Sequence, residues 1–189
     1  MKVLIACEYS GRVRDAFIKE GHNAISCDLL EGEGLHSHKH YKGNVFDIIN
    51  NNYDLLIAFP PCTHLCSSGA RWFPEKIADG RQQEGIEFFL KLANCNIPRI
   101  AIENPVGIMS THYKKPTQYI QPWQFGHGET KKTGLWLKGL NKLVPTNIVE
   151  GREDRIHKLP PSEDRWKIRS TTYEGIANAM AQQWGKNDV

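Results

Sequence analysis

The sequence predicts an α/β fold built on a Rossmann-like, doubly wound and mostly parallel sheet. Apolar strand patterns at 2–7 and 23–28 flank a helical stretch, and strand, helix and strand in so few residues form a βαβ unit with parallel strands. Further strand patterns at 53–59 and 99–102 are separated by helical residues, which continues the alternation. Polar or reactive side chains follow several of these strands, and ligands of such folds bind beyond the carboxyl ends of the strands.

The amino-terminal elements follow from local sequence pattern. KVLIAC at 2–7 predicts a short buried strand, and the helix that follows Gly11 is expected to end at Gly21. NAISCD at 23–28 predicts a second strand that finishes on an acid. Residues 31–43 are rich in glycine and histidine, so they are expected to form a loop.

The rest of the chain continues the alternation less regularly. The expected elements are a strand at 53–59, a helix at 75–94, strands at 99–102 and 134–140, and a final helix at 173–184. Residues 107–130 and 141–165 are expected to be mostly loop or irregular.

Composition indicates one ordinary globular domain. The chain has 189 residues, 40% of them hydrophobic and 24% charged, which excludes a disordered tail, a fibrous repeat and a coiled coil. We expect no contact with a membrane, because no apolar run approaches the ~18 residues of a spanning helix. The early polar residues of the amino terminus do not fit a secretory signal, so a cytoplasmic location is expected. The five cysteines are expected to be reduced.

Positive charge gathers in one segment. Residues 110–170 carry 12 basic and 6 acidic side chains, whereas residues 1–109 carry 11 and 13. Such a segment can attract a phosphate-bearing partner. A solvated basic surface explains the charge about equally well.

Two strand ends carry the strongest candidates for chemistry. Cys62 follows two prolines directly after the 53–59 strand, and prolines stiffen the loop that would hold a nucleophile. The alternative is an inert, buried thiol. Glu103 ends the 99–102 strand, where a partly buried carboxyl group can hold a raised pKa and donate a proton. Its alternative role is to cap a nearby helix.

The opening βαβ unit has features of a nucleoside site. Asp28 ends the second strand, the place where nucleotide-binding units put an acid for ribose hydroxyls. Of the glycine-rich turn of such units only Gly11 is present, which favours a nucleoside ligand that needs no pyrophosphate cradle.

We expect no metal site. His36, His38 and His40 alternate in a way that resembles a metal tract, but no second ligand cluster completes them, so an exposed loop is preferred. A second possible cluster contains Cys62, His64 and Cys66, and it is one ligand short of a structural zinc site.

Read together, these segments resemble the DNA (cytosine-5) methyltransferase family. AFPPCTHLCSSG at 58–69 resembles its Pro-Pro-Cys block, and AIENPVG at 101–107 resembles its Glu-Asn-Val block. Residues 4–29 resemble the opening cofactor block, and KGNVFDI at 42–48 resembles the block after it. The chain is most similar to the compact methylase-like members common in phage genomes, which lack a full target-recognition domain.

The resemblance implies a chemistry and a set of site residues. Cys62 would add as a thiolate to C6 of cytosine, Glu103 would protonate the ring, and C5 would receive a methyl group from S-adenosylmethionine. The target base of duplex DNA would be flipped into the pocket. The implied cofactor contacts are Gly11, Asp28, Asn44 and Pro60, and the implied substrate contacts are Asn104, Lys131 and Lys132.

The chain is short for a member of this family. Between the basic block and the last helix only 32 residues remain, 141–172, where a target-recognition domain would stand. We therefore expect a single catalytic domain over 1–189, with a short irregular basic segment at about 110–170. DNA would then be bound with little specificity, or a partner protein would supply recognition, or the substrate would be a free pyrimidine nucleotide.

A non-catalytic binding or decoy protein that keeps the fold is a further alternative. It is favoured by Glu8, Tyr9 and Ser10 in the usually glycine-rich turn, and by Thr63 in place of the family's glutamine.

Overall fold

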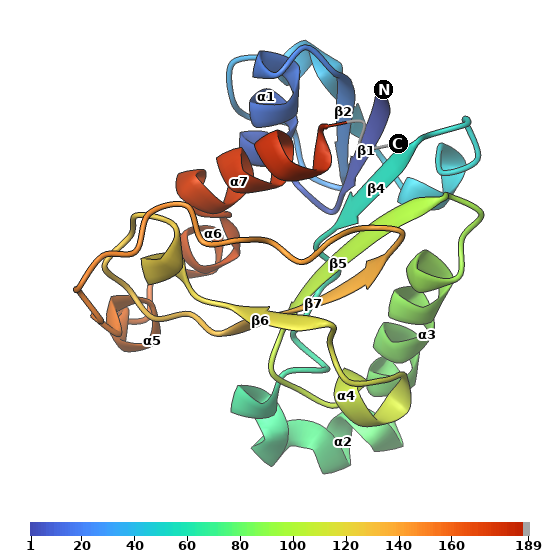
Figure 1. Cartoon of the computed structure of the whole chain (residues 1–189). Helices are drawn as coiled ribbons and strands as arrows, with labels where there is room; N and C mark the ends of the chain where they lie inside the picture. The colour runs from blue at the N-terminus through green and yellow to red at the C-terminus, as the bar shows by residue number, and fades with distance from the viewer. Residues whose placement is uncertain (187–189) are drawn as a thin grey trace.

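The computed structural model describes residues 1–186 and contains one sheet with helices on both of its faces (Figure 1). The strands are β1 (Lys2–Ala6), β2 (Asn23–Asp28), β3 (His40–Lys42), β4 (Leu55–Ala58), β5 (Arg99–Pro105), β6 (Gln118–Ile120) and β7 (Thr133–Lys138). The α-helices are α1 (Arg12–Lys19), α2 (Phe73–Ala78), α3 (Arg81–Ala93), α4 (Met109–His112), α5 (Arg155–Lys158), α6 (Arg165–Ser170) and α7 (Glu174–Trp184). Short 3₁₀ turns are η1 (Ser37–Lys39), η2 (Val45–Asp47), η3 (Ser67–Trp72) and η4 (Pro122–Gln124).

The sheet is mixed and has seven strands in the order β3-β2-β1-β4-β5-β7-β6. Strands β1 to β5 pair in parallel, and β7 runs antiparallel between β5 and β6. The prediction of an α/β fold is confirmed. Strand order changes direction between β1 and β4, and in open α/β sheets the ligand crevice lies at such a point, beyond the carboxyl ends of the strands.

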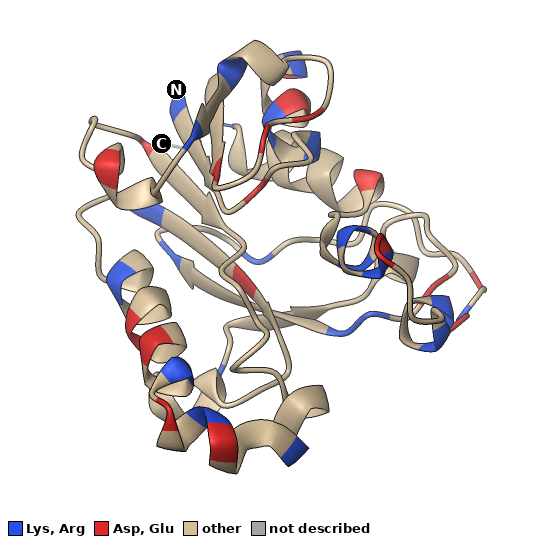
Figure 2. Ribbon diagram, turned by 180° about the vertical axis from the view of Figure 1, so that it is seen from behind, with Lys and Arg blue, Asp and Glu red and all other residues tan. Residues whose placement is uncertain are grey.

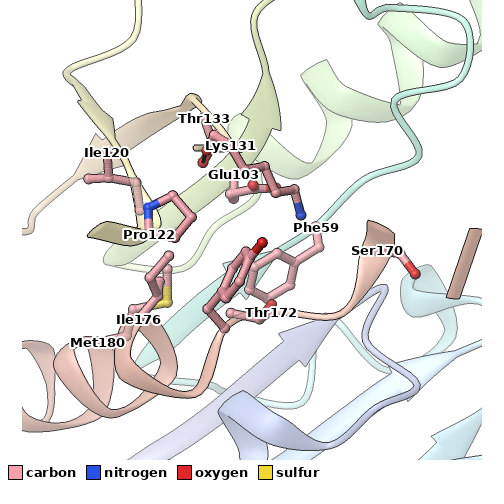
Figure 3. A pocket seen from close by; sticks show the side chains of 11 residues that line it. Phe59, Glu103, Ile120, Pro122, Lys131, Thr133, Ser170, Thr172, Ile176 and Met180 are labelled. Atoms are coloured by element: carbon pink, nitrogen blue, oxygen red, sulfur yellow. Dashed lines mark hydrogen bonds between the residues drawn. The ribbon is translucent and has the colours of Figure 1, made fainter. Parts of the chain in front are cut away.

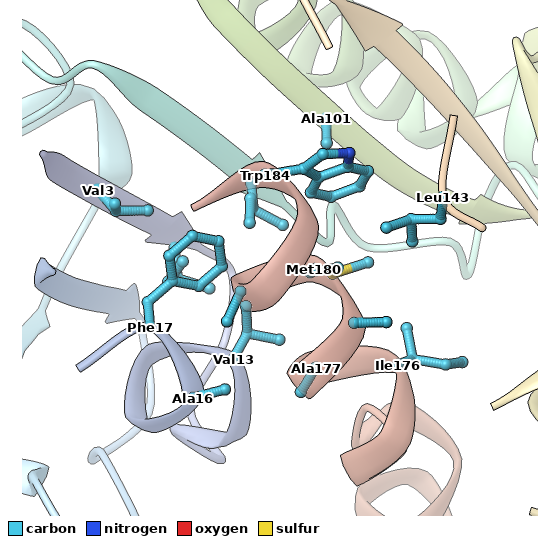
Figure 4. Close-up of a cluster of buried hydrophobic side chains, with 14 of the residues drawn as sticks. Val3, Val13, Ala16, Phe17, Ala101, Leu143, Ile176, Ala177, Met180 and Trp184 are labelled. Atoms are coloured by element: carbon cyan, nitrogen blue, oxygen red, sulfur yellow. The ribbon is translucent and has the colours of Figure 1, made fainter. Parts of the chain in front are cut away.

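The apolar strands feed a separate hydrophobic core on each face of the sheet. Val3 and Ile5 of β1 belong to one core, and Leu4 and Ala6 belong to the other, as the period of two along a strand requires. The first core is covered by α1 and α7, which pack side by side (Figure 4). The second core is covered mainly by α3. Both faces are therefore buried, which explains why the central strands are continuously apolar.

The expected helix over 75–94 is wrong in one respect, because it is two helices. Gly80 stands between α2 and α3 with φ = 84°, a left-handed conformation that an L side chain rarely adopts. The chain turns there, so α2 leaves the axis of α3 (Figure 1).

Three segments expected to be loop contain regular structure. β3 lies in the 31–43 segment, β6 lies in the 107–130 segment, and α5 lies in the 141–165 segment. Each is only three or four residues long, too short for a clear periodic signal. Helix α6 was also not expected. Across residues 1–186 no helix has the length and apolar character needed to span a membrane.

Candidate functional site

The loop that follows β4, residues 59–66, mounts Cys62 at the carboxyl edge of the sheet. Pro60 and Pro61 lead into it, and the carbonyl of Cys62 accepts hydrogen bonds from the backbone N–H groups of Leu65 (3.0 Å) and Cys66 (2.9 Å). Cys62 therefore starts a tight turn and is partly buried, with its thiol free. We call residues 59–66 the Pro–Cys loop.

Two backbone carbonyls tie the Pro–Cys loop to β5 and the residues after it. The side-chain amide of Asn104 donates to the carbonyl of Pro60 at 2.9 Å, and Asn104 is only 1% exposed. The N–H of Ile108 donates to the carbonyl of Leu65 at 3.0 Å. The structure thus places Asn104 as a support of the loop, whereas its implied contact with substrate stays a prediction.

Two buried side chains from the helices beyond the loop hold its other carbonyls. The ammonium of Lys76 donates to the carbonyl of Thr63 at 2.6 Å, and the amide of Gln82 donates to the carbonyl of His64 at 3.3 Å. Lys76 and Gln82 are 7% and 6% exposed. Sequence reasoning missed both residues, because a lysine or glutamine on a short helix is normally solvated and only the tertiary fold buries these two.

Glu103 lies on β5 immediately before Asn104, and the two side chains point to opposite faces of the strand. Burial raises the pKa of the Glu103 carboxyl, while the cation of Lys131 and a hydrogen bond from Thr133 lower it. The net shift is upward, so the carboxyl can carry a proton nearer neutral pH than an exposed glutamate. This is the behaviour that a general acid needs.

Glu103 and Lys131 line the same pocket (Figure 3). The pocket is narrow, with a cavity volume of about 20 Å³, which is room for about one water molecule. The remaining lining comes from the start of the Pro–Cys loop, from β6, η4 and β7, from the end of α6 and the residues that lead into α7, and from α7 itself: Phe59, Ile120, Pro122, Thr133, Ser170, Thr172, Tyr173, Ile176 and Met180. Polar and apolar side chains thus share the lining in about equal parts, and Glu103 and Lys131 are its charged groups.

The two candidate lysines of the basic block are placed differently. The Lys131 ammonium donates to the carbonyl of Arg169 at 2.7 Å and lies 6.0 Å from the ring of Tyr173. Lys132 is exposed and lies over the ring of Tyr119 at 4.5 Å, outside the pocket lining. Only Lys131 therefore faces the pocket, and it does so next to Glu103.

The thiol of Cys62 is electrostatically coupled to this pocket, although Cys62 is not among the lining residues. Burial, together with the neighbouring Cys66 and Glu103, raises its pKa to about 11, whereas Lys131 lowers it. The resting thiol is therefore protonated at neutral pH. A nucleophilic role requires that the proton be removed when substrate binds.

The turn after β1 is packed by protein groups. Gly11 has φ = 70°, and a Cβ placed there would meet the Arg14 guanidinium and would lie 2.5 Å from the carbonyl of Glu33. Arg14 is fully buried and donates to Ser26 and Glu33 at 2.8 and 2.6 Å. Close packing against Arg14 and Glu33 thus explains why this position needs a glycine. Contact of Gly11 with a cofactor stays a prediction.

Glu8, which sequence reasoning did not assign to the site, caps helix α1. Its carboxylate accepts from the N–H groups of Val13 (2.7 Å) and Arg14 (3.3 Å), and Glu8 is 4% exposed. Burial raises its pKa to about 7, although both amides and the Arg14 charge oppose the shift. An acid at this helix start occupies the donors that an anionic ligand would otherwise use.

Asp28 and Asn44 lie farther along the same edge, after β2 and β3. One carboxylate oxygen of Asp28 accepts from the N–H of Leu30 at 3.0 Å, and the side-chain oxygen of Asn44 accepts from the N–H of Phe46 at 3.0 Å. The second carboxylate oxygen of Asp28 and the amide nitrogen of Asn44 take no part in these two bonds. Pro60, in the Pro–Cys loop, is buried, and its carbonyl accepts the hydrogen bond from Asn104.

The histidines of the 31–43 segment support that segment. His40 bonds Ser26 and the carbonyl of Leu30 at 2.8 and 3.0 Å, and His36 contacts Asp15 at 3.2 Å. Among residues 1–186 no group of three or more His, Cys, Asp or Glu side chains is placed to hold a metal ion.

Comparison with known proteins identifies a fold. No family model and no curated protein matches the sequence. Among solved structures, the methyltransferase EhMeth of Entamoeba histolytica is similar over 86% of this chain, with a TM-score of 0.51 and 13% sequence identity. This chain spans 60% of the length of that methyltransferase. At this identity the likeness concerns the fold alone: the chain shares the α/β architecture of a methyltransferase.

Proposed function

We propose that this chain is an S-adenosylmethionine-dependent methyltransferase that modifies C5 of cytosine in DNA through a covalent adduct of Cys62. The observation that carries the proposal is the arrangement around Glu103. A carboxyl group with a raised pKa and the Lys131 ammonium share one pocket, and the neighbouring Asn104 anchors the loop that bears Cys62. These groups come from β5, the segment before β7 and the β4 end, so only the fold brings them together.

The fold supports the assignment to the class I methyltransferases. The mixed sheet has one antiparallel strand, β7, inserted between β5 and β6, and its likeness to a methyltransferase extends over most of the chain. The change of strand direction between β1 and β4 puts the expected crevice beside Glu8 and Phe59. That position adjoins the Glu103 pocket, which Phe59 also lines.

The residues along the crevice fit S-adenosylmethionine. This cofactor carries ribose hydroxyls, an adenine base with hydrogen-bond donors and acceptors, and positive charge. The Asp28 carboxylate suits the hydroxyls, and the Asn44 side chain suits the base. Glu8 is buried and caps α1, which leaves little room for a phosphate there. The bound cofactor would supply an electrophilic methyl group.

The residues of the chain would divide the chemistry between them. Cys62 would lose its proton to water, and its sulfur would form a bond to C6 of the cytosine ring. Glu103 would donate a hydrogen bond or proton to N3, so that the electron pair displaced from the C5–C6 double bond is stabilised. Once C5 has gained the methyl group, with S-adenosylhomocysteine as the leaving group, loss of the C5 proton to water would re-form the double bond and expel Cys62 as a thiolate. Lys131 would stabilise the negative charge on sulfur at both ends of the cycle.

The test is analysis of reaction products by nucleoside mass spectrometry. The protein is incubated with isotopically labelled S-adenosylmethionine and, in separate arms, with duplex DNA, single-stranded DNA or deoxycytidine nucleotides. Labelled 5-methylcytosine from DNA is expected, and Cys62→Ser should abolish it, whereas Cys95→Ser should not. Labelled product only in the nucleotide arm would move the substrate to a free nucleotide.

A non-catalytic binding protein is a second candidate, and one observation favours it. The pKa of the Cys62 thiol is raised to about 11, so the resting site holds no ready thiolate. Absence of labelled base in every arm, together with a thermal shift on adding S-adenosylhomocysteine, would favour this candidate over both enzymes.

A further inference from the structure

Helix α6 borders a second hollow in the molecule, which the proposed reaction does not use. The hollow is an open depression of about 320 Å³ and is lined by Pro161, Ser162, Arg165, Trp166 and Arg169. Figure 1 shows α5 and α6 on the side of the molecule away from α3, and Figure 2 shows basic residues on both short helices.

The two arginines of the hollow have guanidinium groups without partners among the residues that the structure describes. Arg165 and Arg169 are four residues apart, so they lie on one face of α6. Within residues 1–186 neither guanidinium makes a hydrogen bond or ion pair, and the Nε atom of Arg165 is buried without a partner. The acids that precede the helix, Glu163 and Asp164, are exposed and do not pair with them. Two such groups on one face are suited to a phosphate.

An aromatic ring stands between these arginines in the sequence. Trp166 is 48% exposed, and its ring lies 5.7 Å from that of Tyr9 at an angle of 53°. The ammonium of Lys167 lies 5.8 Å from the same ring. A half-exposed indole braced from one side offers a surface on which a nucleobase can stack.

The α6 hollow adjoins the Glu103 pocket through consecutive residues. Arg169 lines the hollow, and Ser170 lines the pocket. The Lys131 ammonium, on the pocket wall, donates to the carbonyl of Arg169. The Tyr9 hydroxyl, from the turn after β1, donates to the carbonyl of Lys167 at 3.2 Å. Helix α6 is therefore fastened to both parts of the proposed active site.

From this geometry we propose that α6 is a subsite for the nucleotide next to the target base in a nucleic-acid strand. A phosphate of that nucleotide lies between Arg165 and Arg169, and its base stacks on Trp166. The inference rests on the proposed function only for the identity of the neighbouring pocket. It deepens that proposal, because it favours a nucleic-acid strand as the substrate. A free nucleotide would occupy the Glu103 pocket and leave the α6 hollow without a ligand.

The proposed subsite should discriminate between single-stranded and duplex DNA. A base can stack on Trp166 only when it has left its own stack, which single strands allow at little cost. We therefore expect a single strand to bind more tightly than a duplex of the same sequence.

Binding of labelled DNA tests the subsite without any methyl transfer. A fluorescein-labelled single-stranded DNA of about eight nucleotides with one central cytosine is titrated with the intact chain, and anisotropy is followed at several salt concentrations. The variants are Arg165→Gln/Arg169→Gln, Trp166→Ala and Trp166→Phe. The control, Lys19→Gln/Lys91→Gln, removes the same charge from exposed sites on α1 and α3. Thermal unfolding checks that each variant is folded.

The expected results differ from those of a nonspecific basic surface. The arginine pair should weaken binding by tenfold or more, and the slope of log affinity against log salt should fall by about 0.7 for each phosphate that the variant no longer neutralises. Trp166→Ala should weaken binding by roughly 5- to 100-fold, and Trp166→Phe should restore most of it. The control should change affinity by less than about twofold.

Three outcomes would overturn the subsite. They are equal reductions of affinity in the arginine pair and in the control, tighter binding of duplex than of single strand, and competition by dCMP as effective as that of the unlabelled oligonucleotide. A lack of methylated product alongside the expected weakening of binding would instead refute the proposed chemistry and leave the subsite standing.

Discussion

At the scale of single residues, the site depends on one cation beside two acidic groups. Burial, Cys66 and Glu103 raise the pKa of the Cys62 thiol, and Lys131 lowers it. Replacement of Lys131 by methionine should raise that pKa further. Because only the thiolate reacts, alkylation of Cys62 by iodoacetamide at pH 8.5 should slow by roughly two- to tenfold.

Peptide mass spectrometry measures this alkylation separately for each of the five cysteines. Lys132→Met is the matched control, because Lys132 lies next in sequence but outside the pocket. An equal slowing in both variants would show that general surface charge, and not the position of Lys131, sets the reactivity of Cys62.

Glu8 gives a second prediction at this scale, about pH and stability. Its folded-state pKa of about 7 exceeds the ordinary value of 4.5 because the carboxyl is buried. The folded state therefore binds the proton more tightly than the unfolded state. Protonated Glu8 therefore stabilises the folded state by roughly 3 kcal/mol at most. This contribution to the free energy of unfolding is fully present below pH 4.5 and is lost as pH rises through 7.

Glu8→Gln should remove this pH dependence. We expect the free energy of unfolding of the variant, relative to that of the wild type, to rise between pH 5 and pH 8 in urea titrations. Glu20→Gln, an exposed substitution at the end of α1, should show no such rise. A constant difference between Glu8→Gln and wild type over this range would refute the assigned shift.

At the scale of elements, the Pro–Cys loop is irregular and gains its shape from β5, α2 and α3. The Lys76 ammonium on α2 satisfies the buried carbonyl of Thr63. Lys76→Met keeps most of the apolar stem but leaves that carbonyl without a donor, which costs about 1–3 kcal/mol. Local opening should then expose the N–H groups of Leu65 and Cys66, which bond Cys62.

Hydrogen exchange of these two amides measures the opening. It should accelerate by roughly 5- to 100-fold in Lys76→Met, and Lys76→Arg should restore part of the protection. Lys91→Met on the exposed side of α3 serves as control. Unchanged exchange in Lys76→Met would mean that Asn104 and Gln82 hold the loop without this bond.

The same elements show what sequence pattern can and cannot predict. The predictions for β1, α1, β2, β7 and α7 are close to their observed bounds, because long apolar runs and helical spacing are local signals. Strands β3 and β6 were not predicted, because a three-residue segment forms a strand only through pairing with its neighbours in the sheet. In the site, Cys62 stands out directly after a strand and Glu103 as an acid beside an apolar run, although β5 pairs with β7 as far as Pro105, so Glu103 lies within the strand and not at its end. Lys76 and Glu8 acquire their importance from burial, which no local pattern reveals.

At the scale of the whole molecule, the two ends of the described chain form one core. Helix α7 packs on α1 and on the face of the sheet formed by β1, β4 and β5. It also lines the Glu103 pocket through Ile176 and Met180. Loss of α7 packing should therefore affect the global fold and the pocket together.

Trp184 is the residue that tests this coupling. It is 3% exposed, it belongs to the core shared by α1 and α7, and its indole N–H donates to the carbonyl of Asn141 at 2.9 Å. Trp184→Ala should lower the free energy of unfolding by about 3–5 kcal/mol, because it leaves a large cavity and an unpaired carbonyl. Trp184→Phe should cost less, since it keeps most of the apolar volume.

Urea unfolding followed by circular dichroism reports on the secondary structure of the whole chain, and accessibility of the buried Cys27 thiol reports on one face of the sheet. Because both cores share one sheet, the two transitions should coincide and shift together in Trp184→Ala. Cys27 belongs to the core on the opposite face from Trp184. If Trp184→Ala exposed α7 early while Cys27 stayed protected, the two faces would be separate folding units, and α7 could close over the pocket independently of the sheet.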